Sequence, residues 1–458
     1  MKSVAFCTLG CKVNQYETDA MEEMFLAAGY QVRTFKEKAD VYVINTCTVT
    51  NIADRKSRQM LHRAKKMNPD SVVAAVGCYV QAAAERLKED PDIDLIVGNN
   101  KKSQIVTLVK ELLDARSHKD AGLSGDLHEE IHEALVDINH TKEYEELHVS
   151  RVCEHTRAYI KIQDGCNQFC SYCIIPYARG RVRSRDPEDI LSEVQTLVER
   201  GYKEIVLTGI HISSYGLDFD NTEYNLSGNR EHLISLIESL SKLGGLERIR
   251  LGSLEPRIIT EDFVQRLCRI PQICPHFHLS LQSGCDTVLA RMNRKYTGDQ
   301  YDASCKLLRR YFDTPAITTD VIVGFPGETP EEFEEGAAFL EHIGFAEMHV
   351  FKYSRREGTR AAAMKDQVDE GVKNQRSARL LELDRKMKDA FIRQWQGREV
   401  KVLLEEKVVI DGKEYMSGHT KEYIRAVVSG SGLRENTIIS AKLSLRLNED
   451  FVFCERID

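Results

Sequence analysis

Short apolar runs alternate with helical stretches through the first hundred residues. Four runs rich in small or β-branched residues predict strands at residues 3–8, 40–45, 71–77 and 95–97. Helical stretches lie between them, for example residues 17–28 and 53–66. Strands that alternate with helices indicate a small parallel α/β sheet, which we place in a first domain over residues 1–116.

A second strand–helix series begins near Arg157. Its expected strands are residues 158–163, 204–208, 248–252, 276–281, 318–323 and 347–351, and the helices between them include residues 187–199, 232–240, 260–269, 299–310 and 330–343. Six such units predict an open or partial (β/α)6 barrel over residues 151–372. In barrels of this kind, the chemistry occurs at the C-terminal ends of the strands.

The last part of the chain changes period twice. Apolar residues at three- to four-residue spacing, from Leu380 to Trp395, predict one amphipathic connecting helix over residues 373–395. Beyond Gly397 the runs become short and strand-like and are separated by turn residues. We therefore expect a small C-terminal β-barrel over residues 396–458.

Charge is unevenly distributed. The whole chain has 63 basic and 71 acidic residues, a formal net charge of −8, so it is not a polycation. Residues 117–150 contain nine acidic residues against two lysines and have poor helical periodicity, which predicts a solvated, flexible acidic linker. The C-terminal module has ten basic and eleven acidic residues and is therefore no strong electrostatic platform for nucleic acid.

No stretch of the sequence predicts a membrane span or a signal peptide. The most apolar run, residues 72–80, is far shorter than the roughly 20 residues that cross a bilayer. The sequence therefore predicts a cytoplasmic protein. In that reducing compartment, 13 cysteines indicate metal ligands, reactive thiols or buried small residues and not a disulfide framework.

Three cysteines form the strongest local motif. Cys166, Cys170 and Cys173 follow the first expected barrel strand in a CxxxCxxC spacing, so one loop can direct three thiolates at one iron–sulfur cluster. Three ligands leave one iron of a cubane open to a small molecule. The competing interpretations, a structural zinc site that lacks its fourth ligand or buried thiols, carry little weight at this position.

A second set of cysteines is dispersed along the first domain. Cys11, Cys47 and Cys78 each follow an expected strand, and the C-terminal ends of parallel strands meet at one edge of a sheet. From spacing alone, separate buried thiols are an equally good interpretation. Cys7 is a possible competing ligand, although it more naturally points from its strand into the sheet. We take the remaining cysteines, 153, 268, 274, 285, 305 and 454, as structural.

These motifs resemble those of a known family. CxxxCxxC in the first loop of a partial barrel resembles the signature of radical S-adenosylmethionine (radical SAM) enzymes. The segments that carry the rest of the resemblance include GCKVNQYET, NTC, TGIHISSYG, RLGSLEP, LSLQSG and DVIVGFPGET. Together they look like the methylthiotransferases, and most like the branch that acts on N6-threonylcarbamoyladenosine in tRNA. The family implies a flavodoxin-like first domain and a C-terminal TRAM module that binds RNA.

The resemblance also implies cofactors and partners. Cys166, Cys170 and Cys173 would hold a [4Fe–4S] cluster that binds and cleaves SAM. Cys11, Cys47 and Cys78 would hold a second, auxiliary [4Fe–4S] cluster associated with the sulfur that is methylated and transferred. The expected partners are the anticodon loop of tRNA and an electron donor such as flavodoxin or ferredoxin, whereas the sulfur source is not defined. The reaction would place a methylthio group on C-2 of the adenosine at position 37.

Further residues are candidates for contacts with SAM or RNA because of their place in the sequence near the cysteine loop or at the end of an expected strand. We expect Tyr172, Ser253 and Glu255 to contact SAM, with packing or turn roles equally open for the last two. Arg179, Arg181, Arg183 and Arg185 alternate just after the cysteine loop, so an extended segment would present all four on one face to RNA phosphate or to the SAM carboxylate; a solvated charged face is the alternative.

Three other functions remain open from the sequence. A sibling enzyme would modify isopentenyladenosine in tRNA, and another would modify an aspartate of a ribosomal protein. A protein of a different class would use fully ligated clusters for electron transfer or would bind RNA without catalysis. Two three-cysteine sets favour open iron sites and therefore an enzyme.

Overall fold

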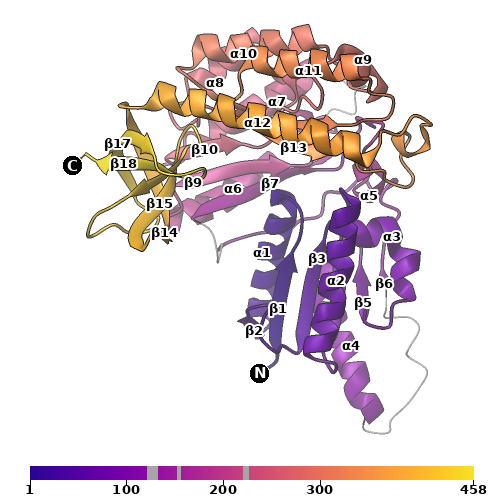
Figure 1. Ribbon diagram of the computed structural model, residues 1–458. Coiled ribbons are helices and arrows are strands. Elements are labelled where there is room, and N and C mark those ends of the chain that lie inside the picture. The colour runs from indigo at the N-terminus through magenta and orange to yellow at the C-terminus, as the bar shows by residue number, and fades with distance from the viewer. Residues whose placement is uncertain (121–132, 152–155, 220–225, 458) are drawn as a thin grey trace.

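The computed structural model describes residues 1–120, 133–151, 156–219 and 226–457. Figure 1 shows an N-terminal α/β unit below a larger barrel, with a small β-module at the side of the barrel. Within these ranges, no helix is both long and apolar enough to cross a bilayer. Cys153 and residues 121–132 of the acidic stretch lie outside the described residues.

The N-terminal unit is a six-stranded parallel sheet in the order β2-β1-β3-β4-β5-β6. Its strands are β1 (Ser3–Thr8), β2 (Gln31–Arg33), β3 (Val41–Thr46), β4 (Val72–Gly77), β5 (Leu95–Val97) and β6 (Glu133–Ala134). Its helices are α1 (Lys12–Ala27), α2 (Asn51–Met67), α3 (Cys78–Lys88) and α4 (Ile105–Asp120). This order confirms the flavodoxin-like expectation and adds β2 and β6, which are too short to predict from periodicity.

Both faces of this sheet are covered because neighbouring strand residues point to opposite sides. Val41 and Val43 pack with Phe25 of α1 and Val109 of α4. Tyr42 and Ile44, together with Val73 of β4, pack against α2 and α3 on the other face. The loops at the C-terminal ends of β1, β3 and β4 are consequently left free to build a site at one edge.

The central unit is the predicted partial barrel. Six parallel strands form two sheets, β10-β9-β7-β8 and β11-β12-β13, with the short β8 (Arg183–Ser184) antiparallel to β7. Isolated bridges between residues 249 and 273 and between residues 254 and 279 join the two sheets. The parallel strands are β7 (Arg157–Asp164), β9 (Glu204–Gly209), β10 (Arg248–Leu251), β11 (His276–His278), β12 (Ala316–Val323) and β13 (Glu347–Lys352).

Helices cover the outside of this barrel. They are α6 (Pro187–Glu199), α7 (Leu226–Leu240), α8 (Glu261–Cys268), α9 (Asp286–Arg291), α10 (Gly298–Tyr311) and α11 (Pro330–Ile343), and the long α12 (Glu370–Trp395) lies across β13. The short α5 (Ile175–Ala178) instead contacts α3 of the N-terminal unit. Thr297 and Thr329 each form a capping box with the residue three positions later, which explains the sharp starts of α10 and α11.

The C-terminal module is a closed five-stranded barrel in the order β14-β15-β16-β18-β17. Its strands are β14 (Glu399–Ile410), β15 (Lys413–Thr420), β16 (Arg425–Val428), β17 (Ile438–Arg446) and β18 (Val452–Arg456). Ile392 and Trp395 at the end of α12 belong to its core, so the connecting helix also closes the module. The small β-barrel expected from the sequence is therefore confirmed.

One expectation about organisation is wrong. Residues 133–150 are not a solvated linker: Leu147 and Val149 are buried in the barrel core, and the Tyr144 hydroxyl donates to the Lys161 carbonyl at 2.9 Å. The acidic composition predicted a solvated segment, but Glu145 is buried and accepts a hydrogen bond from the Ser103 backbone at 2.9 Å. This segment fastens the N-terminal sheet to the barrel.

Candidate functional site

The contiguous cysteine loop is held by local backbone bonds. It begins after β7, where the Cys166 amide donates to the Gly180 carbonyl at 3.0 Å, and the Cys173 amide donates to the Cys170 carbonyl at 3.0 Å. Ser171 anchors its middle, because its hydroxyl donates to the Arg291 carbonyl at 2.8 Å. A single loop therefore determines how these three thiols are arranged.

The three thiols of this loop face one another. Burial raises the pKa of Cys166 to about 12, and the Cys170 thiolate adds to the shift. Burial also raises the pKa of Cys173, with further contributions from the charges of Cys170 and Cys166. Three mutually repelling soft ligands in a buried pocket need a bound metal to remain deprotonated, so the donor set fits an iron–sulfur cluster.

An arginine outside the motif contacts this loop. Arg294 donates to the Cys170 sulfur at 3.3 Å and, through its other terminal nitrogen, to the Ser280 carbonyl at 3.2 Å. No sequence pattern pointed to a role for Arg294. Its position lets it offset the negative charge of a thiolate cluster.

The dispersed cysteines also come together. Cys11 directly precedes α1, Cys47 follows β3, and Cys78 is the first residue of α3. Burial raises the pKa of Cys47 to about 11, with electrostatic contributions from Cys78 and Cys11. Cys11 is exposed, whereas Cys47 and Cys78 are buried, so the triad has one open side.

Close backbone approach makes this triad possible. Gly10 has φ +108°, and an added Cβ there would lie 3.0 Å from the Cys47 sulfur. Cys7 is not part of this edge: it packs under α2 with the core and interacts electrostatically with Lys56 and Arg63. The expectation that Cys7 points into the sheet is therefore confirmed.

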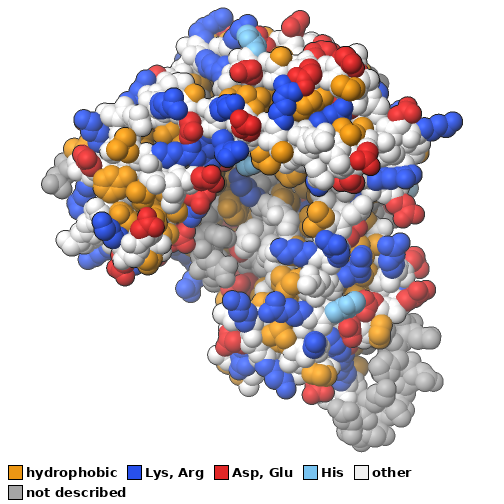
Figure 2. Space-filling view, in the orientation of Figure 1, with side chains coloured by type: hydrophobic (Ala, Val, Ile, Leu, Met, Phe, Trp, Pro, Cys, Tyr) orange, Lys and Arg blue, Asp and Glu red, His pale blue; other side chains and the backbone are white. Residues whose placement is uncertain are grey.

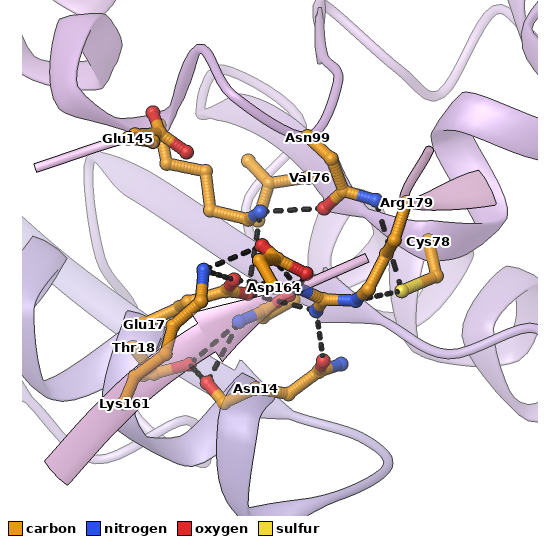
Figure 3. Close-up of polar contacts among 12 residues, drawn as sticks. Asn14, Glu17, Thr18, Val76, Cys78, Asn99, Glu145, Lys161, Asp164 and Arg179 are labelled. Carbon is orange, nitrogen blue, oxygen red and sulfur yellow. Dashed lines mark hydrogen bonds and ion pairs between the residues drawn. The ribbon is translucent and has the colours of Figure 1, made fainter. Parts of the chain in front are cut away.

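A buried ion network joins the two cysteine sites (Figure 3). Arg179 lies just past the loop of Cys166, Cys170 and Cys173, which we call the radical loop. Its Nε donates to the Cys78 sulfur at 3.0 Å. Its terminal nitrogens reach Glu17 of α1 at 2.8 Å and Asp164 at the end of β7 at 3.1 Å. Lys161 pairs with both of these carboxylates, at 2.8 Å and 2.6 Å. One guanidinium thus links the auxiliary triad to the strand that carries the radical loop.

Electrostatics favours the charged state of this network. The guanidinium of Arg179 together with Lys102 and Lys161 holds the pKa of Glu17 well below its usual range, against the opposing effect of burial. Asn14 extends the network, because its side-chain oxygen accepts from Arg179 at 2.8 Å and its side-chain nitrogen donates to the Leu9 carbonyl at 2.7 Å. The loop that carries Cys11 is thereby tied to the barrel.

The expectation that four arginines share one RNA-facing surface is wrong for three of them. Arg179, Arg183 and Arg185 are buried, and only Arg181 is exposed. Arg185 pairs with Asp189 at 2.6 Å and with Glu193. The four arginines do not lie on one extended segment. Helix α5 ends just before Arg179, and the chain then turns at Gly180, which has φ +72°.

The three candidate SAM residues lie around the radical loop. Tyr172 is partly buried beside Phe325, with ring centroids 6.5 Å apart. Ser253 is exposed just beyond the end of β10. Glu255 accepts from Gln168 of the loop at 3.5 Å, but its carboxylate is also engaged by Arg257 at 2.6 Å. Contact of these residues with SAM stays a prediction.

His211 is a further neighbour that the sequence analysis left without a role. Its Nε2 lies 3.6 Å from the Glu255 carboxylate, and its Nδ1 lies 2.6 Å from the Ser214 hydroxyl. Burial lowers its pKa to about 4, so it is neutral near pH 7. The quoted TGIHISSYG segment was the only sequence signal for it.

Comparison with known proteins agrees with this architecture. Residues 160–340 match the model of the radical SAM superfamily, and residues 3–98 match that of "Uncharacterized protein family UPF0004". A solved radical SAM methyltransferase, TsrM from Kitasatospora setae, superimposes with a TM-score of 0.55 over 79% of this chain and 77% of its own, at 16% identity. Fold and cysteine loop together define a radical SAM protein.

Curated relatives show which radical SAM proteins this chain is similar to. The chain is 42% identical over 444 residues to the threonylcarbamoyladenosine tRNA methylthiotransferase MtaB of Bacillus subtilis, covering 97% of this chain and 94% of that protein. It is 40% identical to the protein of the same name from Aquifex aeolicus, over 88% and 93% of the two chains. A tRNA-2-methylthio-N(6)-dimethylallyladenosine synthase of Moorella thermoacetica is 33% identical over 97% and 96%.

The chain belongs to the radical SAM methylthiotransferase family. As a member it uses SAM and two [4Fe–4S] clusters.

Proposed function

We propose that this enzyme inserts a methylthio group at C-2 of N6-threonylcarbamoyladenosine at position 37 of tRNA. The observation that carries the proposal is the pairing of two three-cysteine sites through Arg179. Such a pairing suits a reaction in which one site generates a radical and the other delivers sulfur. The names of the relatives from Bacillus subtilis and Aquifex aeolicus supply the substrate.

We assign Cys166, Cys170 and Cys173 to the cluster that binds SAM, and Cys11, Cys47 and Cys78 to the auxiliary cluster. When bound, these groups supply the radical chemistry and the sulfur that an unreactive C–H carbon requires. The protein's own contribution is to hold the two sites at a fixed separation, to keep water from the buried side of each, and to orient the base between them.

The remaining partners follow from this assignment. The C-terminal barrel is the proposed TRAM module for tRNA, and Arg181, whose guanidinium lies over the Phe169 ring at 4.4 Å, is an exposed cation near the cysteine loop. An unpaired anticodon loop makes it inexpensive for the base to leave its stack. We propose an electron donor such as flavodoxin or ferredoxin for the radical cluster. We also propose a cytoplasmic location, because tRNA is found there and the reducing compartment protects the thiols from oxidation.

A direct test offers the reconstituted enzyme two tRNAs of identical sequence, one with the threonylcarbamoyl group and one bare. We expect methylthiolation of the modified tRNA to exceed that of the bare tRNA by roughly 10⁴-fold, because a site built for polar groups is left with unpaired atoms when they are missing. Equal reaction of both would reject the proposal. Selective reaction of an isopentenylated tRNA, or of a ribosomal-protein aspartate, would assign the enzyme to another branch.

A further inference from the structure

A lysine without an ion-pair partner lies beside the auxiliary triad. Lys12 directly follows Cys11 and is the first residue of α1, and its side chain is exposed. Among the described residues, no carboxylate lies within ion-pair distance of its amine. Figure 2 shows the surface hollowed where the N-terminal unit, the barrel and the C-terminal module meet. Electrostatic interactions with Tyr423, Arg157 and Glu204 place Lys12 on the side of this junction.

A polar group of three side chains lines the concave side of the barrel. His278, Asp320 and His349 come from the neighbouring strands β11, β12 and β13, and one nitrogen or oxygen atom of each lies within 4.8 Å of the others. His278 Nε2 is 3.3 Å from the Asp320 carboxylate, and Asp320 is directly opposite His349 in the strand register. Asp320 directly precedes Val321 on β12, and Val321 packs in the helix-covered core. Its side chain therefore points to the opposite, concave side.

A tyrosine of the C-terminal module borders this space next to the first residue of β11. The Tyr423 ring stacks against His276 and His419, with centroids 4.6 Å away in each case. Arg250 lies over the same ring at 4.7 Å. His276 interacts electrostatically with both Lys12 and His278. Lys12 and the three-residue polar group therefore border the same interior space.

Lys12 and Arg294 connect this space to the two cysteine sites. Lys12 is one residue from Cys11, and Arg294 connects the Cys170 sulfur to the Ser280 carbonyl. Ser280 is two residues beyond His278, which corresponds to about 6.6 Å of extended chain. A base whose C-2 faces the two cysteine sites would extend its N6 substituent in a different direction, because C-2 and C-6 are separated by N-1. That direction leads into the space between Lys12 and His278.

We propose that Lys12 together with His278, Asp320 and His349 forms the subsite for the threonylcarbamoyl group of the substrate. The inference rests on the proposed function. The Lys12 ammonium pairs with the threonyl carboxylate, whereas the imidazoles and Asp320 bind the hydroxyl and urea groups, which offer both donors and acceptors. This arrangement also explains why Lys12 has no carboxylate partner within the described protein: the substrate provides it.

The test uses the holoenzyme and two anticodon stem-loop RNAs, one with threonylcarbamoyladenosine and one in which the threonyl carboxylate is replaced by a carboxamide. We expect the wild-type enzyme to bind the acid roughly 10- to 100-fold more tightly than the amide, the usual effect of a charged hydrogen bond. Lys12→Met should bind both with equal affinity, and Lys12→Arg should restore the preference. Lys110→Met, on the exposed side of α4, is the matched control and should keep the full preference.

Two results would overturn the subsite. One is a Lys12→Met enzyme with normal iron content that still prefers the acid. The other is a wild-type enzyme that methylthiolates both RNAs but does not distinguish them, which would leave the proposed function intact. If the wild-type enzyme methylthiolates neither RNA, the proposed function fails and the subsite fails with it. Asp320→Asn gives an independent check: it should weaken binding of acid and amide by the same factor, because it changes no contact to the carboxylate.

Discussion

The two cysteine triads are built in opposite ways. The radical loop places three cysteines within eight residues and is held by backbone bonds to its immediate surroundings. The auxiliary triad takes its cysteines from the C-terminal ends of three strands of the N-terminal sheet and is contacted by Arg179 from the barrel. The first site depends on one loop, whereas the second depends on how two units of the protein pack together.

This difference has an energetic consequence. Arg179, Glu17, Lys161 and Asp164 are all buried, and removal of one charge would leave its partners uncompensated in a low-dielectric interior. Distant changes in the network should therefore disturb the auxiliary site, while the radical loop should tolerate them.

The largest effect is expected when the radical loop loses its ligands. The triple change Cys166→Ala, Cys170→Ala and Cys173→Ala should abolish reductive SAM cleavage and reduce iron from about eight to about four atoms per chain after anaerobic reconstitution. Iron analysis and deoxyadenosine quantification measure both outcomes. Unchanged iron content would mean that this loop does not hold a cluster.

Arg179 should matter to one site more than to the other. Arg179→Met leaves Glu17 and Asp164 without a guanidinium, and we expect a loss of about 3–5 kcal/mol in the free energy of unfolding. The spectroscopic signature and reduction potential of the auxiliary cluster should shift because its Cys78 sulfur loses a hydrogen-bond donor. Arg179→Lys should restore part of the stability but not the potential, since lysine cannot reproduce the planar set of donors.

The matching measurement is the potential of the radical cluster in the same variants. A shift of that potential as large as the shift at the auxiliary cluster would show that the network serves both sites equally. The contrast between the two triads would then be wrong.

A buried carboxylate at the start of β9, which belongs to neither triad, provides a control on stability. Arg250, with Arg157 and Arg248, lowers the pKa of Glu204 to about 2 in spite of its burial. A lowered folded-state pKa means that the stabilisation is complete above the unfolded pKa of about 4.3 and is lost as the pH falls toward 2. Glu204→Gln should therefore flatten acid unfolding below pH 4, as followed by circular dichroism, without a change in either cluster signal.

The smallest effect is expected at Arg181. As an exposed arginine beside the cysteine loop, it should contribute one phosphate contact to tRNA binding. Arg181→Ala should weaken binding a few-fold and lower the salt dependence by about one counterion. An unchanged salt dependence would remove Arg181 from the RNA surface and would leave the four predicted arginines without any RNA role.

The sequence predicted the features that are local. Period and turn signals identified both α/β units and the C-terminal barrel, and the eight-residue motif identified the radical loop. Parallel-sheet geometry predicted that Cys11, Cys47 and Cys78 can meet at one edge, and only the family resemblance favoured this over separate buried thiols. Features that depend on long-range pairing were missed: Arg179 looked like a surface cation, and the acidic residues near Glu145 looked solvated. The burial of these charges depends on partners distant in the sequence, Glu17 for Arg179 and Ser103 for Glu145.

The division of labour between the triads is the central claim, and one paired assay tests it. Cys78→Ala and Cys173→Ala, each checked for an intact fold, are incubated with SAM, a reductant and threonylcarbamoylated tRNA, and both deoxyadenosine and methylthiolated nucleoside are quantified. We predict that Cys173→Ala forms neither product, while Cys78→Ala still forms deoxyadenosine but no methylthiolated nucleoside. Equal loss of deoxyadenosine in the two variants would contradict the account.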